Sequence, residues 1–327
     1  MKEAIDIYFD ENYGKLYEKI ENGILEIFTY EDENGKITSQ FLKREIPEKI
    51  EGETYFDLVT PYGYGGPIVE FSNNKEKLLE NFEKIFSKYC IENNIVSEFV
   101  RFHPICKNYE DFEKMYNAQY MRKTLITKLT EEDPVTNQFG KSCRKNIRQA
   151  INKGVTFKIT KNPDEIGMFK EIYYSTMDRN NATDYYYFDD EYFNDILKYY
   201  KENLILVEAE YEGKTIAAGI YFIYKGIIHI HLSGTLNEYL SLSPAYILRY
   251  AVTMWGIENG YELIHHGGGR SNSPEDNLYL FKKNFAKKYD VDFYTGKKIW
   301  NQKIYNKLCE IKNVDEDEGY FPAYRKN

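Results

Sequence analysis

The stretch YELIHHGGGRSNSPEDNLYLFKKNFA, residues 261–286, decides how the chain is interpreted. An apolar run around Ile264 predicts a strand, and three glycines follow it directly: Gly267, Gly268 and Gly269. Glycine adopts backbone angles that are closed to other residues, so a sharp turn is expected there. The residues Ser-Pro-Glu-Asp from position 273 then predict a helix start, with a serine cap and a proline in the first turn.

The predicted helix carries Phe281 and Lys282. A backbone without side chains, next to a helix terminus and a lysine, is suited to hold a phosphate or a developing oxyanion. A strand-to-helix turn that needs glycine for its geometry alone would explain the same residues. The stretch by itself leaves both interpretations open.

Length and composition favour a globular protein of about two domains. The chain has 327 residues, of which 42% are hydrophobic, and its amino-terminal residues lack the basic-then-apolar pattern of a signal peptide. The most apolar stretch, 219–232, is broken by Lys225 and Gly226 and is too short to span a bilayer. These features predict a cytoplasmic protein.

The cysteines and histidines give no pattern for a metal site. The four cysteines lie far apart, at Cys90, Cys106, Cys143 and Cys309, which argues against a zinc site and against a disulfide framework. None of the five histidines has helix-type ligand spacing. We therefore expect no metal.

The charge is unevenly distributed. The net charge is −9, yet residues 134–163 contain no acidic residue and seven basic ones: Lys141, Arg144, Lys145, Arg148, Lys153, Lys158 and Lys161. A second basic stretch runs from 282 to 303 and contains two acidic residues, Asp290 and Asp292. Solvated helix faces explain such runs, but a polyanionic ligand (a nucleotide diphosphate, coenzyme A or an RNA backbone) also fits them.

The order of predicted elements repeats. Residues 4–10 alternate like a strand, residues 24–46 predict a hairpin with an Asn-Gly turn, and residues 75–93 predict an amphipathic helix. After a basic connector, residues 204–234 predict three strands, residues 243–259 a buried helix, and two short strands follow near 291–301. This duplication predicts an amino-terminal domain (1–136), a basic connecting helix (137–153) and a carboxy-terminal domain (154–327).

Local motifs along nearly the whole chain resemble one family. They are TPYGYGGP (60–67), RFHP (101–104), CRKNIRQAINKGV (143–155), YYSTMDRNNATDYYYF (173–188), HGGG (266–269), LFKKNFA (280–286) and FPAYR (321–325). With the element order, they resemble the Fem family, peptidyltransferases that build peptidoglycan bridges on two GNAT acyltransferase folds. The resemblance implies an α/β (α+β) fold of two tandem GNAT-like domains, each with a mixed, mostly antiparallel central sheet flanked by helices.

The resemblance implies an acyltransferase without a permanently bound cofactor. Its acceptor would be the primary amine of a nucleotide-linked cell-envelope precursor, held by the first half and the domain cleft, and its donor an aminoacyl-tRNA or an acyl-CoA. GNAT enzymes that use acetyl-CoA usually have a Q/R-x-x-G-x-G/A loop, and the corresponding segment SGTLNEYLSLSP (233–244) lacks it. Aminoacyl transfer from tRNA to a peptidoglycan precursor is therefore slightly preferred.

Two other functions stay open. One is a GNAT-type N-acyltransferase that uses acyl-CoA on an amino sugar or sugar nucleotide of surface-polysaccharide synthesis. The other is a non-catalytic module that binds RNA or a nucleotide. No DNA partner and no membrane span are expected, peripheral membrane contact is left open, and the oligomeric state is not predicted.

The family's catalytic Phe-Lys pair matches Phe281 and Lys282, and the ammonium group would stabilise the tetrahedral intermediate. His103 would accept a proton or be a buried structural histidine. The candidate substrate-binding residues are Arg101, His103, Tyr62 and Tyr64 for the acceptor, Arg144, Lys145 and Arg148 for phosphates, Arg179 and Tyr185 for the nucleotide precursor, and the three glycines at 267–269. Tyr62 and Tyr64 would alternatively pack at a bend.

Overall fold

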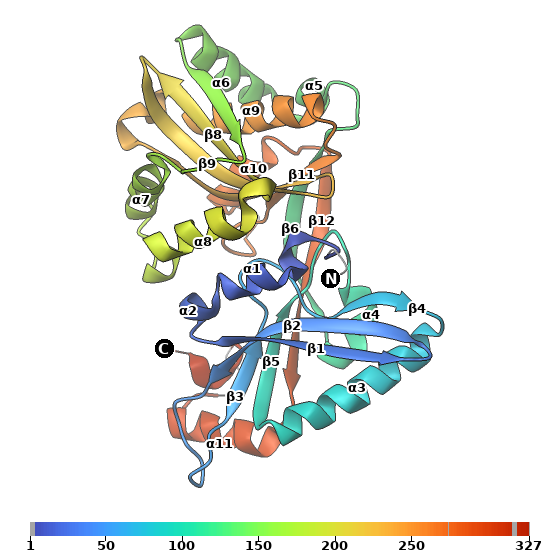
Figure 1. Ribbon diagram of the computed structural model, residues 1–327. Coiled ribbons are helices and arrows are strands. Elements are labelled where there is room, and N and C mark those ends of the chain that lie inside the picture. Colours follow the sequence, from blue (N-terminus) through green and yellow to red (C-terminus); the bar gives the residue numbers. More distant parts are fainter. Residues whose placement is uncertain (1–3, 274, 316–318, 327) are drawn as a thin grey trace. The chain divides into compact units, whose positions relative to one another are not determined.

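The computed structural model describes residues 4–273, 275–315 and 319–326. The chain forms two compact units, one of Met1–Arg122 with Asp292–Asn327 and the other of Lys123–Val291 (Figure 1). This division differs from the predicted domains, which end at 136 and begin again at 154. The difference arises because β12 (Tyr289–Ile299) pairs antiparallel with β5 (Ile95–Arg101), so the carboxy-terminal segment becomes part of the first unit.

The sheet of the first unit has the strand order β1-β2-β3-β5-β12, and β4 pairs with β2. Its further strands are β1 (Ile24–Asp32), β2 (Gly35–Glu45), β3 (Phe56–Val59) and β4 (Ile68–Ser72). β1 and β2 form the predicted hairpin, in which Asp32 lies opposite Gly35. β3 and β5 run parallel, while the other pairs are antiparallel, so the sheet is mixed and mostly antiparallel as predicted.

The helix predicted at 75–93 is α3 (Lys75–Glu92), and it buries the apolar stripe Leu78, Phe82, Phe86 and Cys90 against the sheet. Its first turn is capped by Asn74, whose side chain accepts from the N–H of Lys77. The strand predicted at 4–10 is wrong. Those residues form the 3-10 helix η1 (Ile7–Phe9), because the Asp6 carboxylate accepts from the N–H of Tyr8 and so favours a turn.

The FPAYR motif at 321–325 packs on the first unit and forms hydrogen bonds with its strands. Tyr324 and Ser97 share a hydrogen bond of 2.7 Å between their hydroxyl oxygens. The fully buried carboxylate of Asp57 accepts from Nε of Arg44 and from Nε of Arg325, each at 2.7 Å. The motif therefore contributes to the folding of this unit through a buried ion triad.

A second buried carboxylate, Glu98 on β5, is 2% exposed and accepts from the indole N–H of Trp300 at 3.2 Å. Burial raises its pKa from the ordinary 4.5 to about 8, against the opposing effect of its hydrogen bonds. Between these two pH values the folded protein holds a proton that the unfolded chain has released. Stability therefore decreases as pH rises from about 4.5 through about 8.

We expect Glu98→Gln to remove this slope, because glutamine has no carboxyl group to ionise in that position. Urea unfolding midpoints of the wild type and the variant at pH 5, 6, 7 and 8 test this. The wild type should lose stability relative to the variant with each step upward. Unfolding midpoints that change with pH by the same amount in both proteins would contradict this prediction.

The second unit has the strand order β6-β11-β10-β9-β8-β7. The strands are β6 (Gln119–Lys128), β7 (Thr156–Lys161), β8 (Leu204–Tyr211), β9 (Lys214–Tyr224), β10 (Ile227–Thr235) and β11 (Leu263–Gly267). β6 begins in the first unit and continues into the second. Only β10 and β11 are parallel among these pairs, so this sheet too is mixed and mostly antiparallel.

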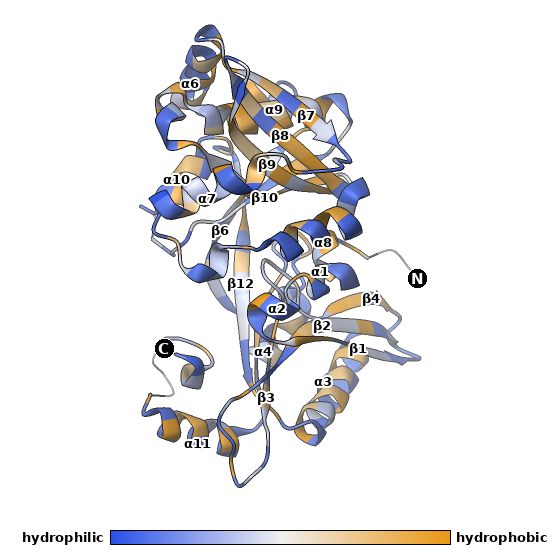
Figure 2. Ribbon diagram, turned by 60° about the vertical axis from the view of Figure 1, so that its left-hand side comes forward, coloured by the Kyte–Doolittle hydropathy of each residue, from blue (hydrophilic) through white to orange (hydrophobic). Residues whose placement is uncertain are grey.

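Helices cover both faces of the second sheet. The buried helix predicted at 243–259 is α9 (Pro244–Glu258), and it packs on β7, β8 and β9. The opposite face is covered by α7 (Phe169–Arg179) and α8 (Asp190–Tyr200), as shown by the ring contact between Tyr200 and Phe222. β8 and β9 are buried on both faces, and Figure 2 shows them as mainly hydrophobic.

The remaining elements are helices. They are α1 (Glu11–Lys15), α2 (Glu18–Glu21), α4 (Tyr109–Tyr116), α5 (Pro134–Gln138), α6 (Lys141–Asn152), η2 (Asp184–Tyr186), η3 (Lys201–Asn203), η4 (Asn237–Leu242), α10 (Asn277–Lys283), α11 (Gln302–Lys312) and η5 (Ala323–Arg325). Within the described residues, no helix is long and apolar enough to cross a membrane. The same residues contain no group of three or more His, Cys, Asp or Glu that could hold a metal ion.

Candidate functional site

The glycines at the end of β11 and the helix α10 are joined by a compact loop. Gly267 has φ of 72°, a left-handed angle that favours glycine. Asp276 caps α10 by accepting from the N–H of Tyr279 at 2.8 Å. Its other oxygen accepts from the N–H groups of Arg270 and Ser271. One carboxylate thus holds both the loop and the start of the helix.

The helix starts later than the sequence predicted. The serine at 273 lies before the helix, which begins at Asn277 with Asp276 as its cap, and Pro274 lies outside the described residues. Burial raises the pKa of Asp276, but the N–H donors of Tyr279, Ser271 and Arg270 outweigh it and lower the pKa below its ordinary value. The cap therefore stays ionised at neutral pH, which suits a helix amino terminus.

Lys282 lies in the last turn of α10 and reaches back to the glycines. Its Nζ donates to the carbonyl oxygen of Gly268 at 2.7 Å, and the side chain is half-buried. An ammonium group donates hydrogen bonds, and the bond to Gly268 fixes the direction of this side chain toward the glycines. The structure therefore brings Lys282 and the glycine segment together, as the motif HGGG with LFKKNFA predicted.

Gly269 leaves room for the cap. A Cβ at this position would lie 2.6 Å from Oδ1 and 2.7 Å from Cγ of Asp276. We expect Gly269→Ala to displace the Asp276 carboxylate and, with it, the start of α10, and to lower turnover more than stability. Thermal unfolding and turnover of Gly269→Ala, beside Gly260→Ala as a control at a glycine with open space, measure this. The Gly260 control has φ of 73°, so its own effect should be on stability.

Aromatic side chains surround the base of Lys282. The ring of Phe281 lies 5.4 Å from that of Tyr246 on α9 and 5.2 Å from that of Phe285, each edge-on. The imidazole of His266 stacks on Phe285 at 6.2 Å. Phe281 is therefore a packing residue that fixes α10 against α9, and it positions the neighbouring Lys282.

His266 is buried and its tautomer follows from its partners. The Thr127 hydroxyl donates its one proton to the carbonyl oxygen of Phe285 at 2.8 Å. It must then accept from Nε2 of His266, 2.9 Å away, so Nε2 carries the proton. Burial lowers the pKa of His266 well below its ordinary value, and the cations Arg249 and Lys282 lower it further. This histidine is neutral at physiological pH and orients Phe285.

A buried arginine lies beside this network. Arg249 on α9 is 4% exposed, and its guanidinium carbon lies 5.6 Å from the ring of Tyr221. Three buried atoms here, Nη1 of Arg249, the hydroxyl of Tyr221 and Nδ1 of His266, have no hydrogen-bond partner within the described residues. Burial lowers the pKa of Arg249. The interior next to Lys282 is thus polar and positively charged.

The predicted acceptor residues gather at one edge of the first unit, where the parallel strands β3 and β5 end. Arg101 donates from Nη1 to the carbonyl oxygen of Thr60 at 2.8 Å. His103 is fully buried, its Nδ1 accepts from the N–H of Cys106, and its Nε2 lies 3.5 Å from Asp6. The ring of Tyr64 lies 5.6 Å from His103.

Two of these residues favour the structural interpretation. The carbonyl oxygen of Tyr62 accepts from the hydroxyl of Tyr13, and the ring of Tyr62 packs on Tyr17. The buried environment of His103 likewise fits the structural histidine that was the alternative to a proton acceptor. The edge nevertheless brings Arg101, His103, Tyr62 and Tyr64 into one neighbourhood, and their role in binding the acceptor stays a prediction.

The predicted phosphate-binding residues separate into two kinds. Arg144 donates from Nη1 to the carbonyl oxygens of Thr136 and Phe139, so its guanidinium closes the turn before α6. Lys145 and Arg148 are exposed on α6. Arg144 is therefore bound to its own backbone, whereas Lys145 and Arg148 are exposed to solvent.

Arg179 connects the end of α7 to the end of β10. Its guanidinium donates to the carbonyl oxygen of Thr235 at 3.1 Å, to the hydroxyl of Thr235 at 2.9 Å and to the side chain of Asn237. Burial lowers its pKa. Tyr185 lies in η2, with its ring against that of Tyr186.

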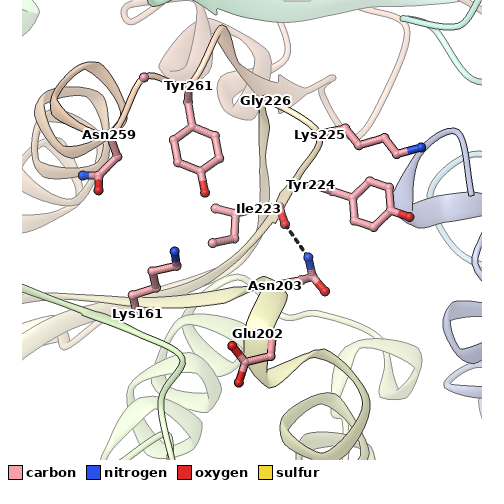
Figure 3. A pocket seen from close by; sticks show the side chains of 10 residues that line it. Lys161, Glu202, Asn203, Ile223, Tyr224, Lys225, Gly226, Asn259 and Tyr261 are labelled. Carbon is pink, nitrogen blue, oxygen red and sulfur yellow. Dashed lines mark hydrogen bonds between the residues drawn. The ribbon is translucent and has the colours of Figure 1, made fainter. Parts of the chain in front are cut away.

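A cavity of about 300 Å³ in the second unit lies at the other end of β11. Its lining residues come from the turn between β9 and β10, the end of α9, β7 and η3 (Figure 3). Asn203 donates to the carbonyl oxygen of Ile223 within this lining. The cavity borders Gly260 and Tyr261, which precede β11 in the chain. The glycine segment lies at the opposite end of β11, so the cavity is not next to it. None of the predicted site residues lines it.

The sequence analysis missed Asp276, Thr127, His266 and Arg249. A signal for Arg249 is present, because it is the one charged residue in the apolar helix sequence PAYILRYAVTMWG. Thr127 carries no such signal, because its role depends on β6 pairing with β11, which is distant in sequence.

Comparisons with known proteins agree with this fold. Residues 108–214 match the model of the FemAB family. The structure is similar to a crystal structure of FemX, with a TM-score of 0.66 at 14% identity, covering 92% of both chains. It is also similar to a tandem GNAT protein from the clavulanic acid biosynthesis pathway, with a TM-score of 0.51 at 8% identity, covering 90% of this chain and 97% of the other. The predicted tandem GNAT-like fold is confirmed.

A relative supports the family resemblance in sequence. The UDP-N-acetylmuramoylpentapeptide-lysine N(6)-alanyltransferase of Weissella viridescens is 23% identical over 188 residues, which are 57% of this chain. The match covers 54% of the relative, so it spans about half of that protein's length. With the family match and the FemX likeness, it confirms the predicted resemblance to the Fem family.

Proposed function

We propose that this protein transfers an aminoacyl group from aminoacyl-tRNA to a primary amine of a nucleotide-linked peptidoglycan precursor. The observation that carries the proposal is the ammonium group of Lys282, held at 2.7 Å from the Gly268 carbonyl oxygen beside the glycine segment. The similarity to a protein named as a muramoylpentapeptide-lysine alanyltransferase supports the acceptor class.

The proposed reaction is aminolysis of an ester. The neutral amine attacks the ester carbonyl, and the carbonyl oxygen gains negative charge in the tetrahedral intermediate. The bond from the carbonyl carbon to the ribose oxygen of the tRNA then breaks, and the proton from the amine passes to that oxygen. Lys282 would stabilise the oxyanion by charge and hydrogen bonding.

No protein base is assigned to the proton transfer. His266 is neutral, because burial and two nearby cations lower its pKa well below the ordinary value. A group that resists protonation in this way is a poor proton acceptor at neutral pH. The substrate's own hydroxyl groups would carry the proton from the amine to the leaving ribose oxygen.

The segment between β10 and α9 supports tRNA over coenzyme A. It contains the 3-10 helix η4, and its backbone N–H groups are engaged internally, as Tyr239 donates to Leu236 and Ser243 donates to Leu240. A pyrophosphate cradle requires backbone N–H groups that point at the ligand. The acyl-CoA alternative on an amino sugar would need this segment to rearrange.

The proposal is tested by incubating the protein with UDP-N-acetylmuramoylpentapeptide that contains lysine and with tRNA charged with labelled amino acids. We expect label to enter the precursor and the product mass to rise by one aminoacyl group. A precursor with its lysine amine acetylated is the matched control and should take up no label. Equal labelling of the blocked precursor, or no labelling of either, would reject amine acylation.

A further inference from the structure

The start of α6 lies against the segment that follows α10. The N–H of Gly140 donates to the carbonyl oxygen of Asn284 at 2.8 Å, and the N–H of Lys287 donates to the carbonyl oxygen of Gln138 at 2.9 Å. A Cβ at Gly140 would lie 3.0 Å from Cε of Lys287. Lys287 therefore lies next to the first turn of α6. In the chain it follows the last residue of α10, Lys283, by four residues.

Several basic residues of the two basic stretches contact oxygen atoms of the protein. Arg144 binds two carbonyl oxygens, Lys283 pairs with Asp290 at 3.4 Å, and Lys288 pairs with Glu131 at 3.0 Å. Lys158 lies opposite Glu208 in the register of β7 and β8. Lys283 and Lys288 are therefore paired with carboxylates, and Arg144 is bound to the backbone.

Other basic residues of the two stretches are exposed, and four of them lie on α6 or at its start: Lys141, Lys145, Arg148 and Lys287. Within residues 4–273, 275–315 and 319–326, none of the four has an ion pair. Lys141, Lys145 and Arg148 follow the spacing i, i+4, i+7, which places them on one side of α6. Lys287 lies beside Gly140, at the start of the same helix. We call the four residues the α6 basic stripe.

The stripe has the dimensions of a nucleic-acid contact. At 1.5 Å per residue, Lys141 and Arg148 are separated by about 10 Å along the helix. This row is longer than a single phosphate group, so its charges can contact more than one phosphate of an extended strand. The charges lie in a row on an exposed helix and do not converge, which fits an extended polyanion better than a single diphosphate.

Resting on the proposed function, we propose that the α6 basic stripe binds the phosphate backbone of the donor tRNA. The stripe runs along α6 to Lys287, and the chain from Lys287 leads back through Phe285 to α10 and Lys282. An RNA held on the stripe would therefore have its backbone beside the helix that carries the candidate catalytic lysine. In a chain with a net charge of −9, a local patch of four cations would also orient the approach of the tRNA.

The test measures the binding of uncharged tRNA at several salt concentrations. We expect Lys145→Ala/Arg148→Ala to weaken binding about tenfold and to reduce the slope of log K against log salt by about two, one for each lost phosphate contact. The matched control is Lys84→Ala/Lys88→Ala on α3, which removes two exposed positive charges about one helical turn apart, as Lys145 and Arg148 are. It should leave both quantities as in the wild type.

A comparison of donors separates this inference from the proposed function. The ratio of kcat/KM for full-length aminoacyl-tRNA to that for an aminoacylated dinucleotide should fall about tenfold in the stripe variant, because the short donor has almost no backbone. If the wild type uses neither donor, the proposed function fails, whatever the tRNA binding shows.

Two results would overturn the inference itself. One is tRNA affinity and salt slope in the stripe variant equal to those of the wild type. The other is unchanged tRNA binding together with lost binding to vesicles of phosphatidylglycerol and phosphatidylcholine, which would assign the stripe to an anionic membrane surface.

Discussion

Lys282→Ala is expected to lower kcat by about 10²–10³ while the protein stays folded. Removal of one preorganised donor to a developing oxyanion has this effect in acyl-transfer enzymes. The side chain is half-buried and donates to the Gly268 carbonyl oxygen, so its loss affects the glycine loop more than the buried core. The measurements are turnover with saturating donor and acceptor, and thermal unfolding.

The control for this prediction is Lys283→Ala, the next residue on α10. Lys283 pairs with Asp290, and that contact lies outside the glycine segment. We expect turnover of this variant within a few-fold of the wild type. A binding module without catalysis would show unchanged ligand affinity and no measurable turnover in wild type and variants alike. A Lys282→Ala variant as active as the wild type would remove this residue from the mechanism.

Asp57→Ala should be the most destabilising substitution considered. The carboxylate is fully buried between Arg44 and Arg325, so its removal leaves two guanidinium groups near each other without their shared counter-charge. Loss of one partner from a buried ion pair reduces stability by about 3–5 kcal/mol. Urea unfolding should show this loss as a lower midpoint, and the carboxy-terminal segment should become more accessible to protease.

The matched control is Asp111→Ala, which removes a carboxylate from a surface pair. Lys75 donates to Asp111 at 2.8 Å, and 56% of the Lys75 side chain is exposed. Such pairs contribute about 0–1 kcal/mol, so this variant should unfold close to the wild type. Equal losses for Asp57→Ala and Asp111→Ala would contradict the role of the buried triad.

Helices and strands could be predicted where a pattern of residues close together in the sequence determines them. α3 buries the apolar residues that recur at helical spacing, and the hairpin of β1 and β2 forms at its Asn-Gly sequence. The strand expected at 4–10 failed because an Asp6 side chain competes for a backbone N–H, which alternation cannot reveal. The two short strands expected near 291–301 are one strand, β12, because pairing with β5 extends it.

The division of the chain could not be predicted from composition. The basic connector suggested a boundary at 137–153, but α6 is part of the second unit and packs on α9. The return of residues 292–327 to the first unit depends on contacts more than 200 residues apart, such as Arg325 with Asp57 and Trp300 with Glu98. Such contacts leave no periodic signal in the sequence.

The sequence predicted the motif of the candidate site but not the residues that hold that motif in place. The motif HGGG followed by LFKKNFA indicated Lys282 beside the glycines, and the structure shows that contact. The cap of α10 is Asp276 and not the predicted serine at 273. The Asp276 carboxylate accepts from the N–H groups of Arg270, Ser271 and Tyr279. Arg144 and Arg179 were predicted to bind substrate, yet both donate to carbonyl oxygens of their own unit, so proposals for them as ligand residues lose support.

The central claim is that the chain transfers an aminoacyl group from tRNA to an amine. The most direct measurement offers both donors at once: aminoacyl-tRNA with one label and acetyl-CoA with another, in a single reaction with the lysine-containing precursor. The account predicts that only the aminoacyl label appears on the precursor amine and that it disappears with Lys282→Ala. Acetyl label on that amine, or no label from either donor with the wild-type protein, would contradict it.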